Sequence, residues 1–210
     1  MSRYEAVFFD FDGVILESSG IKCMAFRALY QEHGPDVAEA AVAYHQAHPA
    51  ICRRKTIRQC HIRLLGISLS RDALDELARR FSGLIEDAVV ASGWVAGAEV
   101  LLDHHCRSLA MFVVSRMPES ELQRIVRRRG LSGCFRAVRG APPDKVPIIR
   151  ALLHDHRLFP DRTLFVGDSL GDWEAAHATG LGFIGRVPPG RHSPFPPGTP
   201  VVSDLVGLKL

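Results

Sequence analysis

Short apolar runs that lack a helical period recur along the chain and are typical of buried strands in a parallel sheet. They lie at residues 7–9, 109–114, 134–138, 163–166 and 182–184. Between the later runs, apolar residues recur every three or four positions, which predicts helices over 119–129, 146–153 and 171–179. The proline- and glycine-rich segment 187–200 should be a loop before an edge strand at Val201-Val202. This alternation predicts an α/β fold with a doubly wound parallel sheet.

A different pattern fills residues 18–91. Apolar residues there keep a three- and four-residue spacing, with breaks at Gly34-Pro35 and Gly66, and no convincing strand intervenes. The predicted helices cover residues 22–31, 37–46, 55–65 and 71–89. The sequence therefore predicts an α/β core built from residues 1–17 and 92–210, which a small all-helical domain interrupts.

Polar side chains follow three of the predicted core strands. Asp10 and Asp12 end the first strand, and Ser115 ends the second. Asp168 follows a later strand, and Asp172 stands four residues further on, where that strand turns into a helix. Because the carboxyl ends of neighbouring parallel strands share one edge of the sheet, we expect these side chains to meet in one cleft.

The predicted cleft has the composition of a site for a cation and an anion. Asp10 and Asp12 repel each other, so they need either a cation or a shared proton. Oxygen ligands without paired histidine or cysteine suit Mg²⁺. Lys145, at the start of a predicted helix, could balance the acids and hold an anion. The hydroxyl of Ser115 and the amides that follow it can help to bind phosphate.

These residues form a pattern that resembles a known family. The motifs are Asp10-Phe11-Asp12-Gly13-Val14, Ser115 after an apolar strand, Lys145 before a helix, and Gly167-Asp168-Ser169-Leu170-Gly171-Asp172. In this order they resemble the four motifs of the haloacid dehalogenase superfamily. The resemblance covers about residues 1–17 and 92–186, and the helical block looks like the cap domain of that superfamily.

The resemblance implies a role for each acid. Asp10 would be the nucleophile that forms an aspartyl-phosphate. Asp12 would protonate the leaving oxygen and then activate water as a base. The implied cofactor is Mg²⁺, and its implied ligands are Asp10, Asp12 through its backbone carbonyl, Asp168, and Asp172 as a ligand or an indirect partner.

The resemblance also implies a phosphate-binding set. Ser115 and Lys145 would bind the transferring phosphoryl group, where positioning and charge neutralisation dominate catalysis. The residue after the motif serine is often small or an amide in this superfamily, whereas here it is Arg116. Arg116 is therefore a further candidate phosphate contact that departs from the family pattern.

Asp12 is the residue that favours a phosphatase. An aspartate two residues after the nucleophile is similar to the phosphatases and phosphomutases, whose oxygen leaving group needs a proton. The resemblance thus implies a Mg²⁺-dependent phosphomonoester hydrolase. A sugar phosphomutase shares all four motifs, and a non-catalytic binding protein could retain the fold. The second alternative is disfavoured because a binding module has no need for both Asp10 and Asp12.

The helical block carries a basic segment. No acidic residue occurs between Ala40 and Ser70, and Arg53-Arg54-Lys55 lies in the middle of this stretch. A solvated helix face is the simpler interpretation of such residues. The alternative is that Arg53 or Lys55, close to a turn at Pro49, contacts an anionic substrate. The segment is similar to the cap of phosphatase-like proteins of sugar-nucleotide and polysaccharide pathways, which favours a sugar phosphate.

Composition limits the partners. The 210 residues are 47% hydrophobic and 23% charged, and the formal net charge of +3 is too small to indicate nucleic-acid binding. No apolar run has the length of a membrane span. The five cysteines lack paired spacing, and the N-terminus leads straight into the first strand without space for a signal peptide. We expect a cytoplasmic monomer or homodimer that acts on a small phosphorylated substrate, with no nucleic-acid or membrane partner.

Overall fold

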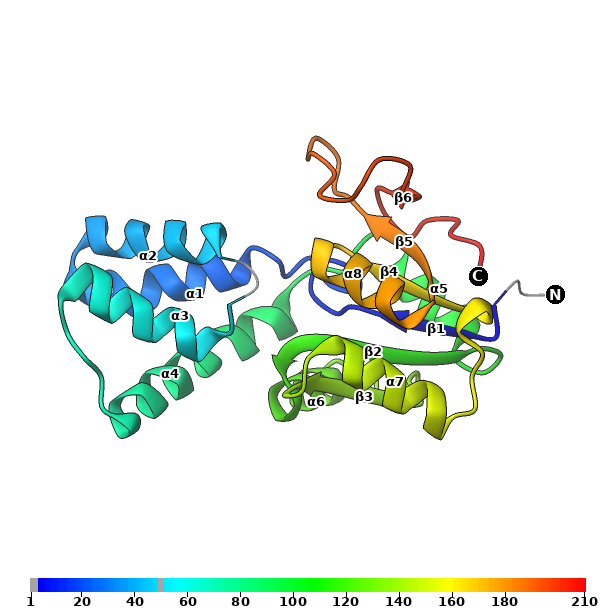
Figure 1. The fold of residues 1–210 in the computed structure, drawn as a ribbon, viewed down its shortest axis with the longest axis horizontal. Helices are drawn as coiled ribbons and strands as arrows, with labels where there is room; N and C mark the ends of the chain where they lie inside the picture. Colours follow the sequence, from blue (N-terminus) through cyan, green and yellow to red (C-terminus); the bar gives the residue numbers. More distant parts are fainter. Residues whose placement is uncertain (1–3, 49–50) are drawn as a thin grey trace. The chain divides into compact units, whose positions relative to one another are not determined.

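The computed structural model describes residues 4–48 and 51–210, so the turn expected at Pro49 lies outside the described residues. The chain forms two compact units. One comprises the residues up to Glu17 together with Ser92–Leu210, and the other is Ser18–Ala91. Figure 1 shows that the strands belong to the first unit, whereas the described part of the second is helical.

The first unit is built on a six-stranded parallel sheet. Its strands are β1 (Ala6–Phe9), β2 (Ala110–Pro118), β3 (Ala137–Ala141), β4 (Thr163–Gly167), β5 (Gly182–Arg186) and β6 (Val201–Val202). Their order is β3-β2-β1-β4-β5-β6, and every neighbouring pair is parallel. The central strand β1 is buried along its whole length, which explains its unbroken apolar sequence. The predicted α/β fold with a doubly wound sheet is confirmed.

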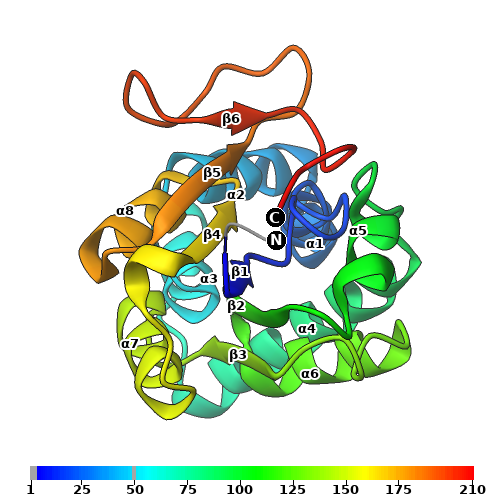
Figure 2. The ribbon, with the colours of Figure 1, turned by 90° about the vertical axis from the view of Figure 1, so that its right-hand side faces the viewer.

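Helices cover both faces of the sheet. They are α5 (Ala98–His105), α6 (Glu119–Arg128), α7 (Lys145–Asp155) and α8 (Leu170–Thr179). Figure 2 shows α7 and α8 on one side of the strands and α5 and α6 on the other. Under α7 and α8, the rings of Phe8 and Phe112 stack with their centroids 4.8 Å apart, in one cluster with Ile149 and Phe165. This cluster holds β1, β2 and β4 side by side, and their carboxyl ends carry the polar residues.

Two parts of the core differ from the sequence-based prediction. The prediction misses α5, because its buried residues Leu101 and Leu102 are adjacent and give a short helix little periodicity. The weak strand expected at 134–138 lies at Ala137–Ala141 instead. Phe135 is buried in the turn before this strand, and the strand itself is largely half-exposed, so the apolar run marks the turn and not the strand.

Every regular element in the described residues of the second unit is helical. The helices are α1 (Ile21–Tyr30), α2 (Pro35–Ala47), α3 (Arg53–Cys60) and α4 (Arg71–Ala91), with a 3-10 turn at Gln31–His33 and a π-helical turn at His61–Leu65. Phe26 and Phe81 pack in its core with ring centroids 4.5 Å apart. The Tyr30 hydroxyl lies 2.7 Å from His61 Nδ1 and donates to Ile57 O over 3.1 Å. Among the described helices, none combines the length and the apolar composition that crossing a lipid bilayer requires.

A buried arginine at the end of β5 fixes the loop that follows β1. Arg186 is only 4% exposed. Its Nη1 donates to Gly13 O over 3.3 Å, and its Nε donates to Ser203 O over 3.0 Å. The guanidinium also forms a forked pair with Glu17, at 2.5 and 3.1 Å. Arg186 therefore ties the loop that carries Asp12 to the C-terminal segment.

We expect Arg186→Met to destabilise the protein. The substitution removes the donors of two backbone carbonyls and the partner of Glu17, at a cost of about 2 kcal/mol. For a chain of this length that cost lowers the melting temperature by about 6 °C. Differential scanning calorimetry measures it, with Arg191→Met as the control because Arg191 is exposed. Equal melting temperatures for the two variants would contradict the role given to Arg186.

Candidate active site

The first two candidate residues lie at the carboxyl end of β1. The Asp10 N–H donates to Val166 O over 2.9 Å, which continues the pairing of β1 with β4. Gly13 then turns the chain with φ +75°, a conformation that disfavours any residue with a Cβ atom. Asp10 and Asp12 are 7% and 6% exposed, so the turn keeps both side chains buried beside the sheet.

Ser115 and Arg116 lie in an irregularity of β2. The pairing of β2 with β3 is regular as far as Val114, and its register then shifts before Pro118. Between these two pairs, Gly140 of β3 alone lies opposite three residues of β2, so the segment Ser115–Met117 bulges from the sheet. A Cβ atom at Gly140 would overlap the backbone oxygen of Met117, so the bulge packs directly on this glycine. The register shift presents Ser115 and Arg116 at the edge that Asp10 occupies.

Lys145 lies between two of the predicted acids. It is the first residue of α7 and is only 5% exposed. Its Nζ donates to Asp10 Oδ1 over 2.7 Å and forms a second, very short contact with Asp172 Oδ1. One ammonium group therefore joins β1 to α8 through two buried carboxylates.

Asp172 is fixed by the start of α8. Ser169 caps this helix, and its N–H and Oγ both donate to Asp172 Oδ2, over 3.0 and 2.6 Å. A Cβ atom at Gly167 would overlap the side chain of Asp172. The backbone of Gly167 therefore packs directly against this side chain and helps to fix the carboxylate. Asp172 is fully buried and accepts from Lys145 with its other oxygen. Asp172 therefore has a fixed position.

The environment separates the proton affinities of Asp10 and Asp172. Burial raises the pKa of Asp10 from 3.8 to about 6, because the charges of Asp172 and Asp12 add to the effect and Lys145 only partly offsets it. Burial also raises the pKa of Asp172, but Lys145 and the hydrogen bonds from Lys145 and Ser169 outweigh it and hold this pKa below its usual range. Burial lowers the pKa of Lys145, and Asp10 and Asp172 together more than reverse that effect. Asp172 and Lys145 thus form a permanent ion pair beside a more basic Asp10.

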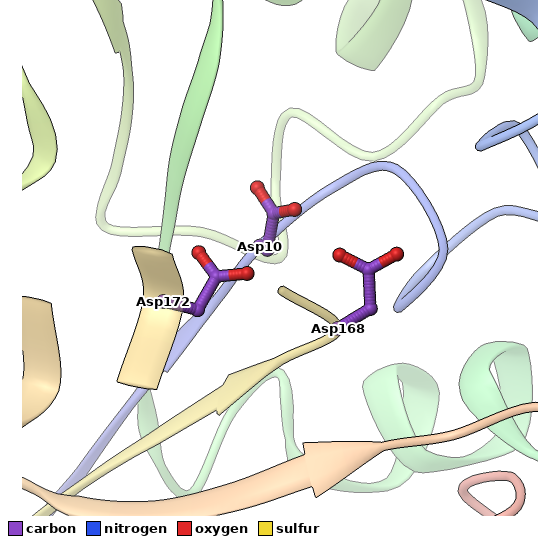
Figure 3. A group of neighbouring side chains, drawn as sticks. All are labelled: Asp10, Asp168 and Asp172. Carbon is purple, nitrogen blue, oxygen red and sulfur yellow. The ribbon is translucent and has the colours of Figure 1, made fainter. Parts of the chain in front are cut away.

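Three carboxylates meet closely enough to hold a cation. Asp10, Asp168 and Asp172 each offer one oxygen, and these atoms lie within 4.8 Å of one another. Figure 3 shows the three side chains at the end of β1, after β4 and in α8. Such a set of hard oxygen donors suits Mg²⁺. Asp12 contributes no carboxylate to this group, and the ligand predicted for it is its backbone carbonyl.

The remaining predicted residues lie in two places. Arg116 is half-buried, and its Nη2 donates to Ser169 Oγ over 3.1 Å. Arg53 and Lys55 belong to α3 in the helical unit. Arg53 Nη1 donates to Ser82 Oγ over 2.6 Å and its guanidinium lies over the ring of Phe81, whereas Lys55 is exposed. The solvated interpretation thus fits Lys55 better than Arg53.

Ser169 is a functional residue for which the sequence motif alone predicts no separate role. This residue caps α8 and orients Asp172, and the signal was present, because Ser169-x-x-Asp172 has the spacing of a capping box. Gly140 was missed as well. The need for a glycine at this position comes from the register shift of β2 opposite it, and no local sequence pattern predicts that shift.

Comparisons with known proteins show which family the chain is similar to. The family model described as "Haloacid dehalogenase-like hydrolase" matches residues 7–186. The tyrosine-protein kinase PtkA of Mycobacterium tuberculosis is 25% identical over 195 residues, which cover 84% of this chain but only 60% of PtkA. The phosphoglycolate phosphatase of Synechococcus elongatus is 26% identical over 180 residues, which cover 84% of this chain and 81% of that protein.

A solved structure shows the same fold at lower sequence identity. The putative hydrolase YfnB of Bacillus subtilis, in a form bound to magnesium, matches with a TM-score of 0.76 and 18% identity. The match covers 97% of this chain and 96% of YfnB. At this identity the likeness supports the fold alone.

In protein freed of divalent cations, we expect Asp10→Asn to change how stability depends on pH. The folded Asp10 carboxyl binds its proton more tightly than the unfolded one, with a pKa of about 6 against 3.8. The contribution of Asp10 to stability is therefore fully present below about pH 4 and is lost as the pH rises through about 6. Between pH 4.5 and pH 7.5, Asp10→Asn should gain on the wild type by an amount on the order of 2 kcal/mol. Urea unfolding with a chelator, at pH 4.5 and pH 7.5, measures the difference, and an equal difference at both pH values would contradict it.

Proposed function

The chain belongs to the haloacid dehalogenase-like hydrolase family, and on that premise we propose that it hydrolyses phosphate monoesters through an aspartyl-phosphate on Asp10. One observation carries this proposal. Lys145 Nζ lies 2.7 Å from Asp10 Oδ1 and also contacts Asp172, at the sheet edge where Asp168 completes a group of three acids. A nucleophile, a cation to neutralise phosphoryl charge and a set of metal ligands thus share one edge.

In the first step, a carboxylate oxygen of Asp10 attacks the phosphorus of the substrate. An Oδ–P bond forms while the bond between phosphorus and the leaving oxygen breaks. Asp12 gives its proton to that oxygen, which leaves as an alcohol. The two carboxylates lie on one short loop after β1, so the acid stands close to the nucleophile that it assists.

In the second step, water attacks the phosphorus of the aspartyl-phosphate. Asp12, now ionised, takes a proton from the water, and the Asp10 carboxylate is released together with inorganic phosphate. The phosphoryl oxygens carry negative charge in both steps. Ser115, Arg116 and Lys145 are the residues that we propose to bind them, through a hydroxyl and two cationic groups.

The acids suit a bound Mg²⁺. We propose that Asp10, Asp168 and the backbone carbonyl of Asp12 hold it directly. Asp172 supports the site mainly through Lys145, because its oxygens already accept hydrogen bonds from Lys145 and Ser169. When bound, the metal supplies charge neutralisation for the phosphoryl group. YfnB, which shares the fold, has been solved in a magnesium-bound form.

The comparisons support phosphoryl-transfer chemistry, and one of them supports a small substrate. The two relatives are named as a tyrosine-protein kinase and a phosphoglycolate phosphatase, which are both phosphoryl-transfer enzymes. The second is matched over most of its length, and its name describes hydrolysis of a small phosphorylated metabolite. We propose a substrate of that class, with a sugar phosphate favoured.

We propose that the helical unit acts as a cap and selects the substrate. Arg53 is the stronger of the two basic candidates, because Ser82 and Phe81 fix its guanidinium. The helical unit also places Lys22 near His45, whose pKa falls because of burial and of the Lys22 charge. Because Ser82 and Phe81 hold its guanidinium, Arg53 has the fixed orientation needed to recognise an anionic or polyhydroxyl group. Exposed Lys55 stays a weaker candidate.

Hydrolysis of p-nitrophenyl phosphate tests the proposed activity. We expect a rate that requires added Mg²⁺ and that Asp10→Asn abolishes, because the nucleophile is lost. Asp12→Asn should lower kcat about 100-fold or more, since the water step loses its base. Asp161→Asn is the matched control, because Asp161 is an exposed aspartate outside the site.

Two outcomes would favour the alternatives. No metal-dependent release of phosphate from p-nitrophenyl phosphate, sugar phosphates, nucleotides, phosphoglycolate or phosphoamino acids would indicate a non-catalytic binding protein. Transfer of phosphate between two positions of a sugar, with little free phosphate, would indicate a phosphomutase.

The substrate that emerges from this panel tests the role of the helical unit. We expect Arg53→Ala to raise its KM about tenfold, and to leave the KM of p-nitrophenyl phosphate unchanged because that ester lacks the recognised group. Lys55→Ala should have a smaller effect, and Arg58→Ala is the control from the exposed side of α3. An unchanged KM and kcat for Arg53→Ala on the physiological substrate would remove Arg53 from the binding site.

A further inference from the structure

Arg116 extends from the bulge of β2 to the start of α8. Its Nη2 donates to Ser169 Oγ over 3.1 Å. We infer that Arg116 is a positioning residue that holds the Ser169–Asp172 segment and, through it, sets Lys145 against Asp10. The functional part of this inference rests on the proposed function. The physical part, a coupling between β2 and α8, does not.

An unbroken hydrogen-bonded path leads from Arg116 to the nucleophile. Ser169 Oγ donates to Asp172 Oδ2 over 2.6 Å. Lys145 Nζ donates to Asp172 Oδ1 and, over 2.7 Å, to Asp10 Oδ1. The last three residues of the path are at most 7% exposed, so water competes little for these bonds.

Arg116 sets the direction of the hydroxyl in this path. A guanidinium is always protonated and can only donate, so Ser169 Oγ accepts from it. The capping interaction gives the same oxygen the backbone N–H of Asp172 as a second donor. With both acceptor sites used, the single hydroxyl proton points to Asp172 Oδ2. Without Arg116, the Ser169 hydroxyl can rotate, and Asp172 Oδ2 then no longer keeps its hydrogen bond from Ser169 Oγ at all times.

Gly171 provides an independent sign of close packing. A Cβ atom at this position would lie 2.7 Å from Arg116 Nη2 and 3.3 Å from its Cζ. Because Gly171 lies in the first turn of α8 and its φ is not positive, alanine suits its backbone. The side chain of Arg116 is thus the obstacle to a larger residue at position 171.

This role differs measurably from a phosphate contact. A guanidinium has five N–H groups, so it can bind both Ser169 and a phosphate oxygen. Loss of a phosphate contact alone weakens substrate binding and does not depend on position 171. Loss of the positioning contact misplaces Lys145 and Asp172, lowers kcat, and couples Arg116 to Gly171.

A double-mutant cycle with Arg116→Ala and Gly171→Ala tests the inference. Arg116→Ala should lower kcat on p-nitrophenyl phosphate about tenfold, in addition to any rise in KM from a lost phosphate contact. Gly171→Ala should lower kcat in the same direction, because its methyl group displaces the guanidinium. In the double variant, Gly171→Ala should cost nothing further. Gly83→Ala in α4 is the control, since a Cβ atom there meets nothing within 4 Å.

Melting temperatures of the same four proteins provide a test that needs no activity. Alanine is the better helix former, so Gly171→Ala should raise the melting temperature more in the Arg116→Ala background than in the wild type. Additive effects in both measurements, or a rise in KM alone for Arg116→Ala, would overturn the inference. If the wild type proves inactive on every phosphate ester, the proposed function fails, and the melting temperatures still decide whether Arg116 holds α8.

Discussion

A single buried ammonium group holds the site together. Lys145 contacts Asp10 and Asp172, which are far apart in the sequence and would otherwise repel each other inside the protein. Removing Lys145 would leave two buried charges without compensation. The two carboxylates are stabilised unequally, because the N–H and the hydroxyl of Ser169 also donate to Asp172 and not to Asp10. Asp172 therefore fixes the lysine, and Asp10 retains the proton affinity of a reactive group.

The fold brings these groups together through a few local irregularities. Parallel strands place Asp10 and Asp168 at one edge, as any open α/β sheet would. The register shift in β2 then brings Ser115 and Arg116 to that edge, and Gly140 is the residue that allows it. The capping box of α8 aims Asp172 back towards Lys145, and Arg186 anchors the loop that carries Asp12. The regular sheet brings the strand ends to one edge, and these irregularities set the positions of the functional side chains there.

Sequence reasoning succeeded where one apolar pattern corresponds to one element. The buried run of β1 and the long periodic helices were predicted within a few residues, and the acids at strand ends followed from topology. Prediction from the sequence failed where the position of a residue depends on its contacts with another element. Helix α5 is too short to show a period, and the apolar Phe135 belongs to a turn beside β3. The contact of Arg116 with Ser169 joins residues far apart in the chain, so no local spacing could announce it.

The proposed mechanism depends most on a covalent bond between phosphorus and Asp10. The most direct measurement is mass spectrometry of the peptide that contains Asp10, after rapid acid quenching of protein mixed with Mg²⁺ and p-nitrophenyl phosphate. Asp12→Asn is the best protein for it, because loss of the base should make the intermediate accumulate. The proposed mechanism predicts a mass increase of one phosphoryl group on Asp10, which borohydride removes by reduction of the acyl phosphate. Turnover without any phosphoryl group on Asp10, or with one on another residue, would contradict it.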